Sequence, residues 1–450
     1  MIKIHKNPKS LMSKKISVSI VTLGCAKNSV DSEFLLGSLN PNSFKLEHIV
    51  NVAPSDVLLI NTCGFIFDAK QESINTILEA VKLKNEGLIT TLIVFGCLTE
   101  RYRNELEKEI PEIDYIFGVN QQKEIRKVIL KGINFYGEYD NSRYTTCRVP
   151  TTPKHYAYLK ISEGCNRKCS FCAIPSIRGG YVSRTIESLV EETKQLAKQG
   201  VKELILIAQD LTFYGYDIYL KPSLALLITK LSEINGIEWI RLHYTYPRFF
   251  NSELIKVIAN NSKVCKYIDM PIQHISNKML KIMNRESSKK NIINLLEKLR
   301  NNIPNVALRT TLLVGHPGET QKDFNELKQF VADFKFSRLG VFPYSHEDGT
   351  YSYLKYKDSV SQKLKTNRLS EIMQVQQEIS LINNNKLINT LQNVIIDCKE
   401  NENYIGRTQF DSPEIDNEVI IKDNNLKIGS FYNIKIIDAT EFDLQGEIIM

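Results

Sequence analysis

The chain has 450 residues, of which 42% are hydrophobic and 24% are charged; this is typical of a globular protein and excludes a disordered or collagen-like chain. At about 150 residues per domain, the length predicts about three domains. The 58 Lys and Arg exceed the 51 Asp and Glu by a net charge of +7, which alone excludes little.

No apolar run approaches the ~18 residues of a membrane helix. The first residues are polar and basic and lack the apolar core of a signal peptide, so we expect a cytoplasmic protein. In that reducing compartment, nine cysteines do not predict a disulfide framework. A patterned subset of them instead predicts metal binding or catalysis.

The first segment, which we bound at 14–130, alternates apolar runs with helical patterns. Three runs have the length of buried strands: 16–25, 56–65 and 91–100. Helical patterns follow them near 29–39, near 68–86 and around 105–110. This alternation is typical of βαβ units, so we predict an α/β domain with a parallel sheet.

The segment 131–154 contains turn-forming residues and two prolines, which predicts a linker. A domain over 155–383 is then predicted from six apolar runs of strand length: 156–162, 203–210, 238–244, 267–273, 307–315 and 338–345. Helical patterns, such as 188–199 and 291–300, separate them. Six successive βα units predict a barrel or partial barrel with its chemistry at the carboxyl ends of the strands.

After a helical stretch near 360–383, short strands separated by turn residues predict a small β-barrel over 384–450. The expected strands are NVIIDCK, NEVIIKD, FYNIKIID and GEIIM. This tail has 6 Lys and Arg against 12 Asp and Glu, whereas the rest of the chain is basic. The asymmetry predicts charged partners.

Three cysteines lie close together in EGCNRKCSFCAIP (163–175): Cys165, Cys169 and Cys172. Three thiolates suit a [4Fe–4S] cluster with one iron open to another molecule. A tetrahedral zinc site takes four ligands, and the alternative is therefore a zinc knuckle that borrows a distant ligand. The motif follows the first strand of the predicted barrel, which places the metal centre at the barrel mouth.

This C-x3-C-x2-C spacing, with Phe171 before the last cysteine, resembles the signature of radical S-adenosylmethionine (SAM) enzymes. The resemblance implies that the open iron binds SAM. It also implies that reduction cleaves SAM to a 5′-deoxyadenosyl radical, which abstracts hydrogen from a C–H bond. The six βα units are similar to the partial (β/α)6 barrel of that family.

Three further cysteines each follow a predicted strand and neighbour a glycine. They are Cys25, Cys63 and Cys97, next to Gly24, Gly64 and Gly96. Since the carboxyl ends of parallel strands share one edge of the sheet, these loops can converge on a bulky ligand. The spacing leaves open a second three-thiolate cluster or three buried structural cysteines. The remaining Cys147, Cys265 and Cys398 show no pattern and are interpreted as small hydrophobic residues.

With both cysteine groups, the chain resembles the methylthiotransferases from end to end: a cluster domain (14–130), a radical SAM core (155–383) and a TRAM β-barrel (384–450). The resemblance implies two [4Fe–4S] clusters. The first, on Cys25, Cys63 and Cys97, holds the transferred sulfur, and the second, on Cys165, Cys169 and Cys172, binds SAM. One SAM supplies the methyl group and another supplies the radical.

Several segments resemble the branch of that family that modifies an aspartate of small-subunit ribosomal protein S-twelve, rather than the branch that modifies tRNA adenosines. They are LGCAKNSVDSE (23–33), 155–184, LIAQDLTFYG (206–215) and GRTQFDSPEIDNEV (406–419). An RNA-binding barrel should be basic, whereas this acidic tail favours a basic protein. The alternative is that its carboxylates form only a solvated surface. We expect the ribosomal protein as partner, free or in the subunit, and neither tRNA nor a membrane.

Six residues near strand ends are candidates for a SAM or substrate pocket: Gln209, Asp210, Gln273, His274, Arg309 and Gly315. Each is equally compatible with a polar residue at the rim. The segment VGHPGET (314–320) resembles a family element near SAM, in which Gly315 and Gly318 permit close approach. Without the resemblance it is only a turn signal. We assign no role to His243 and His316.

These observations predict a radical SAM methylthiotransferase that inserts a methylthio group at the β-carbon of an aspartate, using two SAM and a sulfur donor. The first alternative is a tRNA adenosine methylthiotransferase. The second is a non-catalytic metal-binding protein associated with ribosomes or RNA.

Overall fold

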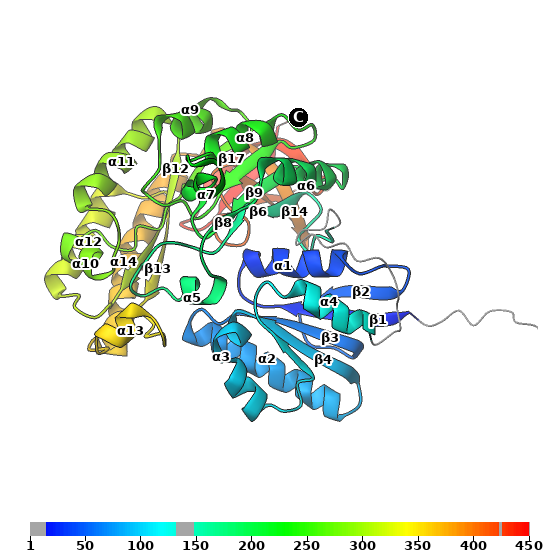
Figure 1. Cartoon of the computed structure of the whole chain (residues 1–450). Helices are drawn as coiled ribbons and strands as arrows, with labels where there is room; N and C mark the ends of the chain where they lie inside the picture. The colour runs from blue at the N-terminus through cyan, green and yellow to red at the C-terminus, as the bar shows by residue number, and fades with distance from the viewer. Residues whose placement is uncertain (1–14, 132–147, 423–424, 450) are drawn as a thin grey trace, which may run out of the picture. The chain divides into compact units, whose positions relative to one another are not determined.

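The computed structural model describes residues 15–131, 148–422 and 425–449, and these form two compact units (Figure 1). The first unit ends at Val149 and the second begins at Pro150, with 65–67 grouped with the second. Most of the predicted linker, 132–147, lies outside the described residues. No helix in the described ranges is long and apolar enough to cross a membrane.

The first unit is a parallel sheet between two layers of helices. Its strands are β1 (Ile16–Thr22), β2 (Phe44–Ile49), β3 (Ser55–Thr62), β4 (Ile89–Gly96) and β5 (Tyr115–Phe117), in the order β2-β1-β3-β4-β5. Its helices are α1 (Ala26–Gly37), α2 (Phe67–Asn85), α3 (Cys97–Glu109) and α4 (Gln122–Lys131). The predicted α/β domain is confirmed, although β2 and β5 were not predicted.

Alternation along β3 explains the layers. Leu58 and Ile60 pack with the apolar side chains of α2 and α3, whereas Leu59 packs with those of α1 and α4. Successive side chains of a strand point to opposite faces, so an all-apolar strand requires helices on both sides.

The second unit contains the predicted six-stranded parallel sheet. Its strands are β6 (Tyr156–Lys160), β9 (Glu203–Ile207), β10 (Trp239–Leu242), β11 (Val264–Asp269), β12 (Ala307–Val314) and β13 (Arg338–Pro343), adjacent in chain order. The main helices are α6 (Ile186–Lys198), α8 (Leu224–Ser232), α9 (Ser252–Asn260), α11 (Lys289–Asn302), α12 (Gln321–Phe334) and α14 (Gln362–Asn385). These helices bury one face of the sheet, where Ile240 and Leu242 belong to the apolar core.

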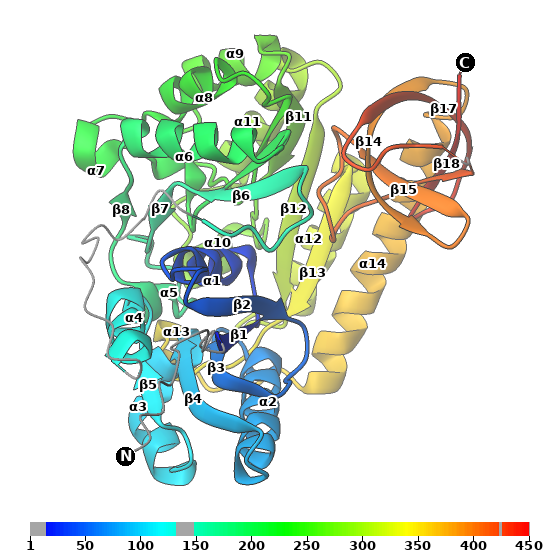
Figure 2. The ribbon, with the colours of Figure 1, turned by 90° about the vertical axis from the view of Figure 1, so that its right-hand side faces the viewer.

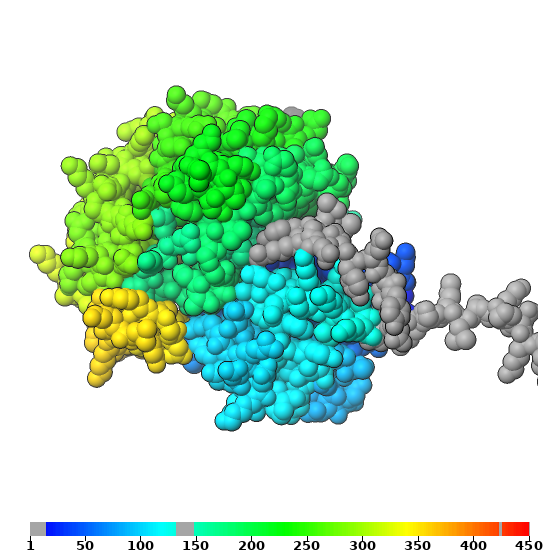
Figure 3. All heavy atoms as spheres, viewed as in Figure 1, coloured from blue at the N-terminus to red at the C-terminus, as the bar shows by residue number. Residues whose placement is uncertain are grey.

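Short elements connect these strands and helices. They are β7 (Ser162–Glu163), α5 (Ile174–Arg178), β8 (Val182–Ser183), a 3₁₀ turn (Leu211–Phe213), α7 (Tyr216–Tyr219), α10 (Asn277–Ile282) and α13 (Tyr351–Lys355). Several of them lie at the carboxyl ends of the sheet strands, where the cysteine loop is also found. In α13, Tyr351 and Leu354 are exposed. This helix is yellow in Figure 3 and lies on the face that is drawn there.

The C-terminal strands close into the predicted small barrel. They are β14 (Leu391–Glu400), β15 (Asn403–Thr408), β16 (Val419–Lys422), β17 (Phe431–Ala439) and β18 (Leu444–Ile448), in the order β14-β15-β16-β18-β17. The sequence pattern predicted four of these strands and missed β15.

A polar segment of this barrel, residues 407–416, meets the amino-terminal ends of the sheet strands, and we call it the plug segment (Figure 2). Arg407 donates to Glu203 of β9 (2.8 Å), and Gln409 accepts from Arg241 of β10 (2.8 Å). Further along the sheet, Tyr267 of β11 bonds Asp416 (2.7 Å) and Arg338 of β13 bonds Asp411 (2.9 Å). Strands from β9 to β13 reach one short segment only if the sheet curves around it, which is the geometry of a partial barrel.

Candidate functional site

The three cysteines of the first unit lie at the carboxyl ends of neighbouring strands. Cys25 precedes α1 just after β1, Cys63 directly follows β3, and Cys97 is the first residue of α3 after β4. The strand order reverses between β1 and β3, and open α/β sheets bind ligands at such a reversal. The fold therefore places all three residues where a ligand is expected.

Glycines bring these loops into close contact. A Cβ added to Gly24, which has a φ of +90°, would lie 2.7 Å from Cβ of Cys63. A Cβ added to Gly64 would lie 2.8 Å from the carbonyl carbon of Cys97. Gly96, with a φ of +111°, lies as closely against the end of β3. The loops can approach one another this closely because glycine, which has no side chain, occupies these three positions.

Asn28 of α1 joins the same three loops. Its Nδ2 donates to the carbonyl oxygens of Leu23 (2.8 Å) and Thr62 (3.1 Å), and its Oδ1 accepts from Cys97 Sγ at 3.8 Å. Asn28 is fully buried. The sequence alone does not mark this residue as part of a site, since a single Asn in a helix pattern gives no signal.

The second cysteine group lies in the loop after β7. Arg167 donates its backbone N–H to Cys165 Sγ (3.4 Å), and Cys172 donates its backbone N–H to the carbonyl oxygen of Cys169 (3.1 Å). Gly164, with a φ of +74°, permits the tight start of this loop. The loop thus bends so that its three sulfur-bearing residues share a small region.

Burial raises the pKa of the Cys165 thiol to about 11 and that of Cys172 to about 12. Both groups are therefore protonated at neutral pH in the absence of a cation. A bound metal deprotonates its thiol ligands and compensates for their burial. These buried thiols are consequently suited to bind iron cations as thiolates.

Across the described part of the chain, no group of three or more His, Cys, Asp or Glu side chains is arranged as a ready metal centre. The chemistry of the donors nevertheless fits iron–sulfur clusters in both units. Each group offers three thiols, and each is built on loops that an added Cβ would obstruct. Cluster ligation by all six cysteines remains a prediction.

Gln209, at the carboxyl end of β9, presents an unused hydrogen-bond acceptor. Its Nε2 donates to Glu163 (3.1 Å), whereas its Oε1 is buried and has no partner among the residues described. Glu163 in turn accepts from Lys160 (2.8 Å) and Arg178 (3.0 Å). A buried amide oxygen without a partner costs about 1–3 kcal/mol. It therefore fits contact with a ligand that carries N–H groups, such as the amino group of SAM.

The neighbouring candidates have partners within the protein. Asp210 accepts from Arg167 of the cysteine loop (2.9 Å) and from Thr212 (2.7 Å), so it holds that loop. Arg309 pairs with Asp269 (2.9 Å) and with Asp416 of the plug segment (3.3 Å).

The last three candidates are also held within the protein. His274 Nδ1 accepts from the backbone of Ser276 (3.0 Å). Gln273 has a φ of +71° and pairs through its backbone with β12. A Cβ on Gly315 would lie 2.4 Å from Cγ of Lys365, so the space beside this glycine is filled. Their contact with SAM remains a prediction.

Three family models match the chain in order. Residues 17–118 match "Uncharacterized protein family UPF0004", residues 159–331 match the radical SAM superfamily, and residues 390–449 match the TRAM domain. Curated relatives extend over almost the whole chain. "Ribosomal protein uS12 methylthiotransferase RimO" of Bacteroides fragilis is 50% identical over 438 residues, which are 97% of this chain and 100% of that protein.

The proteins with the same name from Parabacteroides distasonis and Flavobacterium johnsoniae are 48% and 49% identical. The first match covers 97% of this chain and 100% of the relative, and the second covers 96% and 98%. The chain belongs to the ribosomal protein uS12 methylthiotransferase family. The predicted family and branch are thereby confirmed. Membership in the radical SAM superfamily also supports an iron–sulfur cluster and SAM as cofactors.

Solved structures support the fold of this uS12 methylthiotransferase family member. The radical SAM methyltransferase TsrM from Kitasatospora setae has a TM-score of 0.54 at 14% identity, covering 73% of this chain and 75% of that one. The cobalamin-dependent SAM radical enzyme OxsB also has a TM-score of 0.54, at 11% identity, covering 80% and 56%. At these identities the likeness concerns the fold alone.

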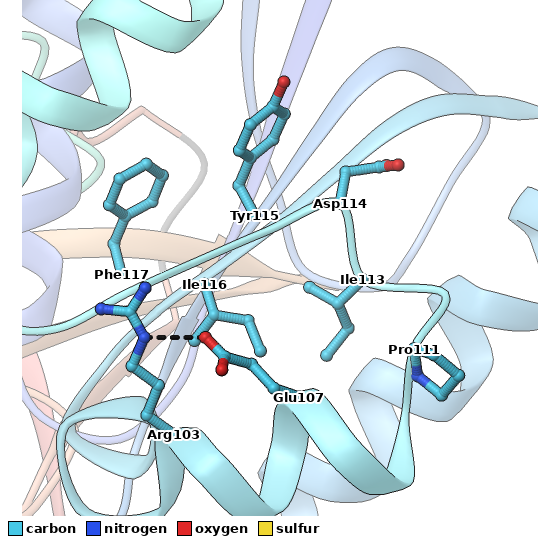
Figure 4. A pocket seen from close by; sticks show the side chains of 8 residues that line it. All are labelled: Arg103, Glu107, Pro111, Ile113, Asp114, Tyr115, Ile116 and Phe117. Atoms are coloured by element: carbon cyan, nitrogen blue, oxygen red, sulfur yellow. Dashed lines mark hydrogen bonds and ion pairs between the residues drawn. The ribbon is translucent and has the colours of Figure 1, made fainter.

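A shallow hollow of about 390 Å³ lies in the first unit, between α3 and β5 (Figure 4). Its lining includes the ion pair of Arg103 and Glu107 (2.8 Å) and the rings of Tyr115 and Phe117. No cysteine lines this hollow. The cysteines predicted to bind clusters therefore lie outside this hollow, which is a separate surface feature.

Proposed function

We propose that this protein transfers a methylthio group to ribosomal protein uS12, at the β-carbon of an aspartate, with two SAM molecules consumed. The observation that carries this proposal is the near-full-length identity with uS12 methylthiotransferases, which includes all three matched regions. The acidic C-terminal barrel supports a basic protein as substrate. Because the target belongs to the ribosome, we expect the protein in the cytoplasm.

We infer two iron–sulfur clusters, one held by Cys25, Cys63 and Cys97 and the other by Cys165, Cys169 and Cys172. When bound, these groups together with SAM supply a carbon-centred radical that removes hydrogen from a C–H bond and a sulfur that replaces it. The support is that both cysteine groups lie in loops after parallel strands, the first group beside glycines without which the loops would clash.

The protein's own side chains hold each of the two cysteine groups in shape within its own unit. Asn28 fixes the three loops of the first unit to one another. In the second unit, Lys160 and Arg178 neutralise Glu163, which orients the amide of Gln209. The Gln209 oxygen is then available to accept from the amino group of SAM.

The test is a competition between two substrates. Reconstituted protein, SAM, sulfide and reductant are incubated with uS12 and an adenosine-containing tRNA together, and mass spectrometry locates the methylthio group. We expect a gain on an aspartate of uS12 alone. A gain on the tRNA would replace the proposal with the adenosine-modifying alternative, and zinc binding without SAM cleavage would favour the non-catalytic one.

A further inference from the structure

A short segment that follows α10 runs alongside the cysteine loop of the second unit. It comprises residues 283–286, and we call it the clamp segment. Met283 accepts the backbone N–H of Ser170 (2.9 Å), and Asn284 Nδ2 donates to the carbonyl oxygen of Lys168 (2.6 Å). Each of the four residues of the clamp segment contacts one residue of the loop 167–170.

The other two contacts carry charge. Arg285 Nη1 donates to Cys169 Sγ at 3.3 Å, and Glu286 accepts from Arg167 at 2.6 Å. The clamp segment therefore places a cation directly against one of the three sulfur atoms. Charge-assisted hydrogen bonds of this kind are stronger than those between neutral groups.

The Arg285 guanidinium is held in place from two other sides. Its Nη2 donates to the carbonyl oxygen of Pro271 (2.6 Å), and its Cζ lies 4.3 Å from the centre of the Tyr246 ring. The Tyr246 hydroxyl in turn accepts the backbone N–H of Glu286 (3.1 Å). Such a fixed side chain loses little further freedom when it bonds a ligand atom.

Within the described ranges, Arg285 forms no ion pair with a carboxylate, in contrast to Arg167, which pairs with both Asp210 and Glu286. Arg285 thus donates to the Cys169 sulfur without a carboxylate bonded to it, and Asp210 also acts on its charge from nearby. Hydrogen bonds to cluster sulfurs and the net charge nearby set the reduction potential of an iron–sulfur cluster.

We propose that Arg285 is a positioning residue that raises the reduction potential of the SAM-cleaving cluster by donating to the Cys169 thiolate. This inference rests on the proposed function, because it requires the cluster on Cys165, Cys169 and Cys172. Reduction adds one electron and no bond or proton, so a nearby cation stabilises the more negative, reduced state. The clamp segment thereby makes this low-potential site easier to reduce.

The test uses the full chain with Cys25→Ala, Cys63→Ala and Cys97→Ala, which leaves one cluster to observe. The midpoint potential is measured by dithionite titration monitored by electron paramagnetic resonance, together with iron content. We expect Arg285→Gln to shift the midpoint to a more negative value at unchanged iron content, and Arg285→Lys to shift it less. Arg248→Gln is the matched control, since Arg248 also pairs with Glu286 (2.6 Å) but does not contact a cysteine.

An unchanged midpoint in Arg285→Gln would overturn the inference while leaving the proposed function intact. If Arg285→Gln loses iron, the result for Arg285→Lys distinguishes two roles. Iron content and potential retained in Arg285→Lys would support the role of the positive charge. An equal loss of iron in Arg285→Lys would show that Arg285 contributes only packing. Absence of any cluster in the starting protein would instead refute the proposed function.

Discussion

The sulfur-bearing residues of this chain have distinct surroundings. Those of the first unit lie between glycine loops fixed by Asn28, whereas those of the second lie in a loop that a separate segment clamps. Cys398, on β14 of the C-terminal barrel, donates its thiol to Glu400 (3.8 Å) and belongs to neither cysteine group. These differences separate the roles of individual cysteines in experiments.

Cys169→Ala should abolish SAM cleavage, because it removes a ligand of the cluster that reduces SAM. Cys63→Ala should retain SAM cleavage and lose methylthio transfer. Each change should lower the iron content by about four atoms per chain. Cys398→Ala is the control and should retain both activities. Formation of 5′-deoxyadenosine, methylthio product and iron are measured on the same samples, and 5′-deoxyadenosine from Cys169→Ala would contradict the assignment.

The elements that hold the site differ in how visible they are in the sequence. The apolar strands β1, β3 and β4 and the six sheet strands of the second unit were predicted, because they are buried on one or both faces. The edge strand β2 exposes Lys45 and His48, which weakens its pattern. The barrel strand β15 contains Gly406, where an added Cβ would lie 2.6 Å from the carbonyl oxygen of Ile395. The strand therefore requires a glycine, but a glycine in a short polar run predicts a turn.

One helix end supplies a pH-dependent element. Thr320 and Asp323 form a capping box at the start of α12, and Asp323 also accepts from Ser276 and Lys278. Burial acts to raise the pKa of Asp323, but hydrogen bonds from Lys278, Thr320 and Ser276 outweigh it and hold the pKa well below its usual range. The ionised form thus stabilises the folded state.

The contribution of Asp323 is fully present above its unfolded pKa of about 3.9 and is lost as the pH falls below that value toward the folded pKa. Asp323→Asn should therefore lower the free energy of unfolding at pH 6 and have a smaller effect near pH 3. Urea unfolding at both values measures this difference. Asp333→Asn, at an exposed position of the same helix, is the control. A pH-independent loss in Asp323→Asn would contradict the ionic role.

At the scale of the whole second unit, a buried ionic network joins the sheet to the C-terminal barrel. Arg407 bonds Glu203 (2.8 Å) and Asp397 (2.6 Å), and the Arg241 side chain is fully buried beside them. The segment 406–419 was noted in the sequence only as a family likeness. Its contact with the sheet strands was not predicted, because Glu203 and Arg407 are 204 residues apart and no local sequence pattern links them.

Arg407→Ala should lower the free energy of unfolding by about 3–5 kcal/mol, since it leaves Glu203 with one buried partner fewer. Lys435→Ala is the matched control: Lys435 forms an exposed pair with Glu447 (3.9 Å), worth at most about 1 kcal/mol. Urea unfolding is followed by fluorescence of Trp239, whose ring lies 4.8 Å from that of Phe431 across the same interface. Equal effects of the two changes would contradict the network's role.

The plug segment also limits how the tail can be exchanged between proteins. A chimaera that receives the C-terminal barrel of an RNA-modifying relative has new partners for Glu203, Arg241 and Arg338. Glu203 then needs a cation, Arg338 a carboxylate and Arg241 a carbonyl oxygen at the positions where the plug segment supplies them. We therefore expect a folded hybrid from grafts that keep residues 407–416 and replace only the other residues of the barrel.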